Sequence, residues 1–452
     1  MKFIKKNSGL IIIFVCINLV LNSSCANKEL LNNQRESSQE VFNETQIKSD
    51  FYEAANEFKR IELESDDYGD LTFLKDVLKD KRIVMLGESS HTVAEYNLIK
   101  GRLIKYLHEE LDYNVIAFES GLADVNFTNE MLVDKSATEA LKNALLGIWY
   151  TDNNIKLLQY IKEQKTSNTP IEIAGVDIQP QQLTSQVLYN FFEDKNRDFA
   201  EELRDVEVEF LKLIRSDFNN VENREWVKNI EELIEKYNVL SNYVKQGEYQ
   251  TFLEDDMKSL ILMILKQRMN ALIDVYNDEY FSNNERDNEP RDKLMSQNLV
   301  YLLEEVYPDE KFVVWAHNAH IMKNRSKIKV ESSDGIPPFV TFVEHLPKKI
   351  IEESYVVGLY MYNGKNTLGQ GEVVDVITDH KKNSIEQHLY QSGHPVTFLN
   401  IDIKDDMSNK YWWNTEGTSK LWGLYEETFI PSEQYDGLIL IKNVNPAKFH
   451  QD

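Results

Sequence analysis

The sequence predicts an α/β fold: a mostly parallel sheet flanked by helices, with a large helical insertion forming a lid or cleft wall. Three observations predict it. Short apolar runs recur along the chain, helical patterns separate the early runs, and one long stretch shows helical periodicity without a convincing strand. With 452 residues, the chain is long enough for two or three domains, or for one large domain with an insertion.

The predicted strands are short runs rich in Val, Ile and Phe, with little alternation between apolar and polar residues. They are residues 82–86, 114–118, 171–176, 311–316, 355–360, 396–401 and 437–441. Strands of this kind are buried on both faces, which is typical of parallel sheets.

Helical patterns lie between the early strands. Residues 92–111 place Leu98, Ile99 and Leu103 on one face, and residues 153–165 show the same spacing of apolar side chains. Because strands and helices alternate with short connections, the sequence predicts right-handed βαβ units. The predicted α/β core comprises residues 50–180 and 306–452.

Residues 181–305 are predicted to form the helical insertion. Charged segments with helical periodicity occupy residues 198–214, 226–243 and 252–276, and the polar residues 283–292 are predicted to form a loop. Such an insertion often forms a lid or one wall of a cleft. A purely structural appendage is the alternative.

The N-terminus resembles a bacterial lipoprotein signal, predicted to cover residues 1–24. Lysines precede a run of apolar residues, 10–21, that is too short to span a bilayer comfortably, and small residues and Cys25 follow. We expect cleavage before Cys25, attachment of lipid there, and a solvated tether over residues 25–49. The predicted location is therefore the cell envelope, anchored to a bacterial membrane. An ordinary secretory signal and an uncleaved anchor are the alternatives.

Cysteine content and charge exclude several functions. The two cysteines are Cys16, inside the apolar run, and Cys25, so the predicted mature body has no thiol for a disulfide, a nucleophile or a metal site. Asp and Glu number 75 against 50 Lys and Arg, which gives a net charge of −25. This balance argues against a nucleic-acid partner, which needs a clustered basic surface.

Polar side chains gather where four of the predicted strands end. They are Glu88 and His91 after the first strand, Glu119 after the second, Asp177 after the third, and His317 and His320 after the fourth. In open α/β sheets, ligands bind beyond the carboxyl ends of the strands. We therefore expect these side chains to share one active site.

This set of side chains favours hydrolysis by water. A neutral histidine beside a carboxylate can take a proton from water, and further histidine or arginine groups can stabilise an oxyanion. A serine hydrolase is disfavoured, because there is no Gly-x-Ser-x-Gly and neither Ser89 nor Ser90 has the elbow glycines on both sides. A metal-dependent hydrolase stays open, because the same His, Glu and Asp residues are competent metal ligands.

At these residues the sequence resembles the erythromycin esterase family. The family pattern is Leu-Gly-Glu-x-x-His, then Ala-x-Glu, then Trp-Ala-His-Asn-x-His, found here at residues 86–91, 117–119 and 315–320. Weaker similarities lie at Asn126, residues 149–158, residues 175–179, Arg291 and Asp292 with Met295 and Asn298, and residues 435–439. The resemblance covers about residues 82–441.

The resemblance implies a metal-independent hydrolase, without a cofactor, that opens a macrolide lactone ring by activating water. It implies that His91 is the general base and that Glu88 and Glu119 orient His91 and the water. It further implies that His317 and His320 bind the substrate or support the developing charge.

The resemblance also implies a basic residue on the helix after the first motif. Lys100 and Arg102 are the candidates, and we favour Arg102 for a contact to the carbonyl or oxyanion. We count Asp177 with the residues that bind substrate or support the transition state. The expected partners are a small-molecule ester, with macrolides as the implied class, and a membrane through the N-terminal lipid.

Two features depart from the family. Ser89-Ser90 and Thr92 replace the commoner Gly/Ala-Thr and Gly around the motif histidine, and Thr92 adds bulk there. The lipoprotein signal places the chain in the envelope, whereas a resistance enzyme is expected in the cytoplasm. Other bulky esters therefore stay open as substrates. A non-catalytic, glycan-binding envelope lipoprotein is a further alternative.

Overall fold

The computed structural model describes residues 55–181, 183–215, 223–246, 253–275, 289–333, 335–368, 371–403 and 411–451. The expected signal peptide, the tether and Cys25 lie outside the described residues. Within the described ranges, no helix is long and apolar enough to cross a membrane. The strands, helices and site below belong to one compact unit, residues 55–403 and 413–452.

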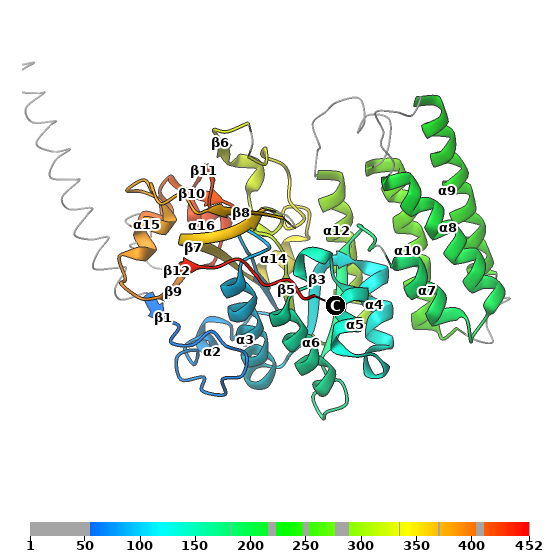
Figure 1. The fold of residues 1–452 in the computed structure, drawn as a ribbon, viewed down its shortest axis with the longest axis horizontal. Helices are drawn as coiled ribbons and strands as arrows, with labels where there is room; N and C mark the ends of the chain where they lie inside the picture. The colour runs from blue at the N-terminus through cyan, green and yellow to red at the C-terminus, as the bar shows by residue number, and fades with distance from the viewer. Residues whose placement is uncertain are drawn as a thin grey trace, which may run out of the picture. The chain divides into compact units, whose positions relative to one another are not determined.

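The centre of the fold is a nine-stranded sheet with the order β1-β9-β12-β7-β2-β5-β3-β4, in which β8 pairs with β7 (Figure 1). The strands are β1 (Ala55–Glu57), β2 (Ile83–Leu86), β3 (Tyr113–Gly121), β4 (Glu172–Asp177), β5 (Lys311–Trp315), β7 (Ser354–Leu368), β8 (Glu372–Asp375), β9 (Val396–Asn400) and β12 (Gly437–Val444). All neighbours from β12 to β4 are parallel, whereas β1, β8 and β9 pair antiparallel. The predicted α/β fold with a mostly parallel sheet is confirmed.

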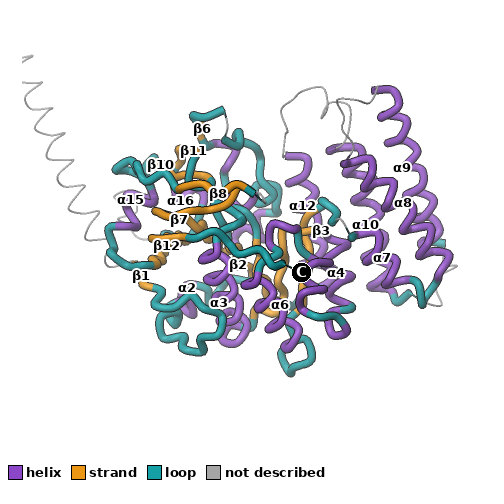
Figure 2. Tube along the Cα trace, viewed as in Figure 1, coloured by secondary structure: helices purple, strands orange, loops and turns teal. Residues whose placement is uncertain are grey.

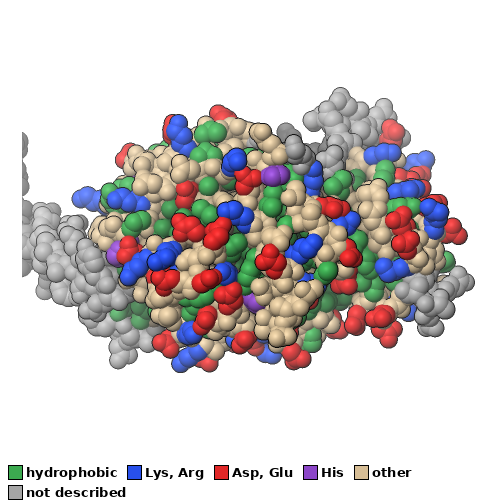
Figure 3. Space-filling model, turned by 60° about the horizontal axis from the view of Figure 1, so that its bottom comes forward, with side chains coloured by type: hydrophobic (Ala, Val, Ile, Leu, Met, Phe, Trp, Pro, Cys, Tyr) green, Lys and Arg blue, Asp and Glu red, His purple; other side chains and the backbone are tan. Residues whose placement is uncertain are grey.

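A small antiparallel sheet joins β10 (Gly417–Leu421), β11 (Tyr425–Phe429) and β6 (Lys329–Val330). The helices outside the segment between β4 and β5 are α2 (Leu74–Val77), α3 (Ala94–Leu111), α4 (Leu122–Glu130), α5 (Ala137–Ala144), α6 (Asp152–Gln164), α13 (Asn318–Ile321), α14 (Lys348–Glu352), α15 (Ile385–Tyr390) and α16 (Pro431–Gln434). Figure 1 shows α3 and α6 next to each other against the strands. Acidic and basic side chains are interspersed over the face drawn in Figure 3.

The apolar periodicity of α3 explains how this helix packs. Ile99, Leu103 and Leu107 are buried and belong to the same core cluster as Val84 and Leu86 of β2. The burial of these side chains is the main favourable term in holding the helix on the sheet. The helix therefore has a fixed rotation, which decides which of its polar residues can reach the end of β2.

Between β4 and β5 the described chain is helical (Figures 1 and 2). The elements are α7 (Thr184–Phe192), α8 (Arg197–Arg215), α9 (Asn223–Lys245), α10 (Asp255–Asn270), η4 (Ala271–Val275), α12 (Glu289–Tyr301) and η5 (Leu302–Val306). The prediction of a loop over residues 283–292 is wrong for the last four of these residues, because α12 begins at Glu289. Pro290 fits there because the first turn of a helix does not need the N–H group that proline lacks. Residues 283–288 lie outside the described chain.

A buried ion pair fastens this helical segment to the sheet. The guanidinium of Arg268 on α10 pairs with the carboxylate of Glu207 on α8, and its Nη1 donates to the carbonyl of Ile178, 3.0 Å away and just beyond β4. Tyr237 of α9 donates its hydroxyl to Glu207 at 2.8 Å. A charge buried this deeply is tolerated only when it is paired and hydrogen-bonded. Arg268 therefore connects three elements to the end of a sheet strand.

We expect Arg268→Met to lower the free energy of unfolding by about 3–5 kcal/mol, because it leaves the carboxylate of Glu207 buried and unpaired. Urea unfolding followed by circular dichroism measures the change. Arg197→Met is the matched control, because Arg197 is exposed on the same helical segment and its ion pair with Glu201, one turn away, is exposed as well. Equal unfolding midpoints for the two variants would contradict this role of Arg268.

Candidate active site

The carboxyl ends of four neighbouring strands bring the predicted residues together. The register pairs Leu86 of β2 with Trp315 of β5, Trp315 with Phe118 of β3, and Gly121 of β3 with Asp177 of β4. The predicted site residues at or just beyond these positions are Glu88, His91, Glu119, Asp177, His317 and His320. Because the strand ends are level, their side chains meet at one edge of the sheet.

The loop after β2 approaches β5 and β7 so closely that only glycine fits at position 87. A Cβ atom on Gly87 would lie 2.0 Å from Oδ1 of Asn318 and 2.9 Å from the carbonyl of Val357. The backbone N–H of Asn318 then donates to the carbonyl of Glu88 at 2.8 Å. This close approach fixes the loop that carries Glu88 and His91.

Glu88 is fully buried and accepts hydrogen bonds from three side chains. Its Oε1 accepts from Nδ1 of His91 at 2.7 Å and from Nε1 of Trp149 at 3.0 Å, and its Oε2 accepts from Nζ of Lys100 at 2.6 Å. Since the carboxylate is an acceptor, the hydrogen-bond network assigns the proton of a neutral His91 to Nδ1. The lone pair on Nε2 is then left to accept a proton.

His91 lies where water and substrate can reach it. Its side chain is 24% exposed, although its partner Glu88 is buried. The ring centroid lies 5.3 Å from that of Trp149 and 4.8 Å from that of His317. Among the described residues, no hydrogen-bond partner engages Nε2 of His91. This nitrogen is therefore the available base of the cluster.

Lys100 is the basic residue of the helix that reaches the cluster. Its ammonium is fully buried, pairs with Glu88 and lies 4.4 Å from the ring centroid of Trp315. Burial lowers the pKa of Lys100 to about 8, although the charge of Glu88 opposes the shift. Lys100 therefore supplies positive charge beside Glu88 that is lost at mildly alkaline pH.

Our expectation that Arg102 contacts the substrate is wrong. Arg102 is buried with its guanidinium on the carboxylate of Asp70, at 2.6 and 3.1 Å, and it also donates to the carbonyls of Arg60 and Asp67. Residues two apart on a helix differ by about 200° in direction, so Arg102 and Lys100 face opposite sides of α3. The rotation of the helix assigns the site to Lys100.

Glu119 organises the other half of the site. Its Oε2 accepts from the backbone N–H of His317 at 2.7 Å, and its Oε1 lies 3.2 Å from Nη2 of Arg291 and 3.3 Å from Nε2 of His320. Burial raises the pKa of Glu119, but the electrostatic attraction of its carboxylate to His320, His91 and Arg291 outweighs burial and holds this pKa well below its usual range. The side chain that orients His91 directly is Glu88, whereas Glu119 acts on His320 and Arg291.

Arg291 and Asp292, at the start of α12, complete this half. Arg291 donates Nε and Nη2 to the two carboxylate oxygens of Asp177, at 3.0 and 2.6 Å, and Asp292 lies 2.9 Å from Nδ1 of His320. Burial lowers the pKa of His320, but the charges of Asp292 and Glu119 outweigh it, so the pKa is raised. In the sequence, the only signal for these two residues is the weak family similarity of the adjacent Arg–Asp pair.

His317 presents a buried hydrogen-bond donor. As the N-cap of α13, it accepts the backbone N–H of Ala319 on Nδ1 at 3.1 Å, which assigns the proton of the neutral ring to Nε2. Burial and the neighbouring His91 hold the pKa of His317 well below its usual range. Its Nε2 is buried and has no partner among the described residues. A neutral, unpaired N–H donor of this kind suits a developing oxyanion.

Trp422 also lies near the site, although no pattern in the sequence indicates it. It lies between β10 and β11 with φ of 55°, a conformation that is strained for a bulky side chain. The backbone N–H of Trp422 donates to the carbonyl of Ser89 at 2.8 Å. The centroid of its indole ring lies 6.4 Å from the ring centroid of His317. Only the three-dimensional approach of the hairpin to the loop after β2 identifies this residue.

Most of the oxygen and nitrogen atoms of the cluster that could bind a metal ion already contact other groups of the protein. Glu119 uses both oxygens, His320 uses both nitrogens, and Nδ1 of His317 accepts a backbone N–H. Within the described ranges, no group of three or more His, Cys, Asp or Glu side chains is arranged to hold a metal ion.

Sequence comparison relates the chain to one family. The family model described as erythromycin esterase matches residues 108–444. A protein of Bacillus subtilis named putative hydrolase YbfO is 30% identical over 398 residues, covering 84% of this chain and 87% of that protein. Erythromycin esterase type II of Escherichia coli is 22% identical over 326 residues, covering 66% of this chain and 73% of that protein.

Solved structures show the same fold. A Bacillus cereus protein superposes with a TM-score of 0.69 at 18% identity, covering 90% of this chain and 99% of that one. An erythromycin esterase mutant in its open conformation superposes with a TM-score of 0.62 at 16% identity, covering 88% and 99% of the two chains.

The raised pKa of His320 generates a prediction about stability and pH. The contribution of protonated His320 to the free energy of unfolding is complete below the unfolded-state pKa of histidine, about 6.5. This contribution is lost as the pH rises through the folded-state pKa of His320. We therefore expect the difference in unfolding free energy between the wild type and His320→Gln to shrink as pH rises above about 6.5. Urea unfolding over a pH series measures it. His394→Gln, at a half-exposed surface histidine, is the control, and a difference that grows with pH would contradict the assignment.

Proposed function

Because the chain belongs to the erythromycin esterase family, we propose that it hydrolyses an ester bond with a water molecule activated by His91. Family membership supports hydrolase activity. The geometry that carries the finer proposal is the arrangement of His91, which Glu88 holds through Nδ1 while Nε2 stays available. Nε2–H of His317 has no partner among the residues that the structure describes, and the ring centroids of His317 and His91 lie 4.8 Å apart.

The proposed reaction begins with proton transfer from water to Nε2 of His91. The water oxygen forms a bond to the ester carbonyl carbon, and the carbonyl π electrons move onto oxygen. The Nε2–H of His317 donates to that oxyanion, while Glu88 stabilises the imidazolium of His91. When the oxyanion collapses, the bond to the alkoxy oxygen breaks and His91 returns the proton to the leaving alkoxide. The products are a carboxylic acid and an alcohol.

In this proposal, the charged residues around Glu119 support substrate binding. Arg291 and His320 lie beside Glu119, and Asp177 and Asp292 hold them in place. The guanidinium of Arg291 carries positive charge, and the raised pKa of His320 favours its protonated form. Positive groups anchored in this way need no reorganisation when negative charge develops, which is the main source of electrostatic catalysis. His320 and Asp177 keep the supporting roles that we expected from the sequence, and Arg291 joins them.

We propose that the reaction is independent of metal ions. The support is that most lone pairs of the cluster already accept hydrogen bonds, so a metal would have to displace the contacts of Glu119, His317 and His320. Elemental analysis of protein purified without added metal tests this point. Stoichiometric zinc or manganese, with activity lost to a chelator, would contradict it.

For the substrate we propose a macrolide lactone or another bulky ester. Two relatives carry the name erythromycin esterase, and that name describes those proteins. For the location we propose a bacterial membrane, to which a lipid on Cys25 anchors the chain. The support for this location is the order of basic, apolar and small residues before that cysteine.

We expect His91→Gln to lower kcat/KM by about 10²–10⁴-fold while the protein stays folded, because it removes the base and keeps the side-chain volume similar. Mass-spectrometric detection of the gain of one water on erythromycin, and release of nitrophenol from a panel of nitrophenyl esters, measure turnover. His394→Gln is the surface control. Unchanged turnover in His91→Gln would remove His91 from the base role, and absence of turnover by the wild type on every ester would contradict the proposed function.

Lys100 and Arg102 provide a matched pair of variants on one helix. We expect Lys100→Met to lower kcat/KM by about 10–100-fold, because Glu88 then loses its positive partner. Arg102→Met should instead lower the unfolding free energy by about 3–5 kcal/mol, because it leaves Asp70 unpaired, with kcat/KM nearly unchanged. Wild-type kcat/KM should also fall as pH rises through about 8, where Lys100 loses its proton, and Lys100→Met should lack this decline. The reverse pattern of the two variants would restore the assignment to Arg102.

A further inference from the structure

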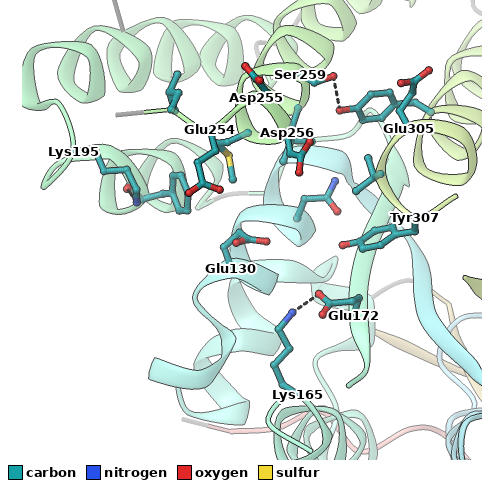
Figure 4. A pocket seen from close by; sticks show the side chains of 17 residues that line it. Glu130, Lys165, Glu172, Lys195, Glu254, Asp255, Asp256, Ser259, Glu305 and Tyr307 are labelled. Carbon is teal, nitrogen blue, oxygen red and sulfur yellow. Dashed lines mark hydrogen bonds and ion pairs between the residues drawn. The ribbon is translucent and has the colours of Figure 1, made fainter. Parts of the chain in front are cut away.

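A large cavity opens at the edge of the sheet opposite the candidate active site. Figure 4 shows the side chains that line this cavity. Its volume is about 760 Å³, and it lies between α4 and β4 of the core and α7, α10 and η5 of the helical segment. Glu172 in its wall begins β4, whereas Asp177 of the active site ends the same strand. At about 3.3 Å per residue, the two ends are about 17 Å apart, so the cavity is separate from the active site.

The wall of this cavity is strongly acidic. The carboxylates of Glu130, Glu254, Asp255, Asp256 and Glu305 line it, and no ion pair with a described residue involves any of them. The two lysines in the wall are already engaged: Lys165 pairs with Glu172, and Lys195 lies 3.6 Å from the ring centroid of Phe191. Asp255 and Asp256 lie in the first turn of α10, where the helix dipole stabilises negative side chains. Their presence in the wall is therefore explained even if no ligand binds there.

Asn126 is the observation that points to a ligand. This residue of α4 lines the cavity and is only 6% exposed, yet neither its amide nitrogen nor its amide oxygen has a hydrogen-bond partner among the described residues. Buried amides are almost always paired, because an unpaired one loses its hydration without compensation. A bound molecule with polar groups would supply the missing partner.

The size and the apolar part of the wall indicate what kind of molecule fits. At about 30 Å³ per water molecule, the cavity has room for about 25 waters, far more than one metal ion needs. Phe191, Met257, Leu260 and Tyr307 provide apolar and aromatic surface between the carboxylates. Methylene groups pack on such surface, and ammonium groups are attracted to both carboxylates and aromatic faces.

We propose that this cavity binds an organic cation that carries two or more ammonium groups on an aliphatic chain, as linear polyamines do. The separated carboxylates pair with the ammonium groups, the apolar side chains contact the methylene groups, and Asn126 accepts a hydrogen bond from an ammonium N–H. This site is independent of the proposed ester hydrolysis and does not involve His91 or its partners.

Titration calorimetry of the full-length chain in mild detergent, with spermidine as the probe, tests the proposal. We expect saturable binding of one spermidine per chain in physiological salt. The double variant Glu130→Gln with Asp256→Asn should bind at least about tenfold more weakly, because two close charge pairs are lost. The control, Glu231→Gln with Glu235→Gln, makes the same change in net charge at exposed positions of α9 and should keep wild-type affinity.

Asn126→Leu separates a ligand-binding asparagine from a structural one. Leucine has a similar size and no unpaired polar atom, so the melting temperature of the ligand-free protein should rise while the increase caused by spermidine is lost. Absence of saturable binding by the wild type would overturn the proposal. So would equal weakening in the control variant, unchanged spermidine binding in Asn126→Leu, or full replacement of spermidine by Mg²⁺ at equal ionic strength. Turnover of esters plays no part in these measurements, so their failure leaves the proposed hydrolysis unaffected.

Discussion

The buried carboxylate of Glu88 is the constraint on which the arrangement of the site depends. A carboxylate with no exposed surface is tolerated only with full pairing, and Glu88 obtains its partners from three separate segments: His91, Trp149 and Lys100. These contacts fix the tautomer of His91 and hold Lys100 of α3 and Trp149 at the end of β2. The same interaction therefore stabilises the fold locally and prepares the base.

A second set of charges joins the helical segment to the sheet. Arg291 and Asp292 come from α12, whereas their partners Asp177, Glu119 and His320 come from strand ends and from α13. The helical segment therefore contributes side chains to the candidate site and also packs through the Arg268 pair. The α12 end of this segment therefore supplies side chains to the candidate site, whereas α8, α9 and α10 pack together through the Arg268 pair.

The sequence predicted the class of the fold and the meeting of four strand ends, because both follow from general rules for parallel sheets. Glu88, His91 and His317 could be identified in this way. Helix rotation could not be predicted to within one residue, so Arg102 was favoured where the structure places Lys100. For Arg291 the one signal in the sequence was its weak family similarity beside Asp292, because its contact with Glu119 spans more than a hundred residues of chain. The contribution of Trp422 depends on an equally distant contact with His317, and no local pattern encodes it.

Trp422 has a left-handed backbone conformation, which sets the stability of the fold against the placement of its indole ring. In that conformation a tryptophan lowers the free energy of unfolding by about 1–3 kcal/mol, whereas glycine adopts the conformation without this penalty. A laboratory selection for heat resistance alone should therefore enrich glycine at this position, at the expense of the indole beside His317. A selection that also demands turnover should retain the indole and recruit compensating substitutions elsewhere. The outcome of the two selections would show whether evolution has kept local strain for the benefit of catalysis.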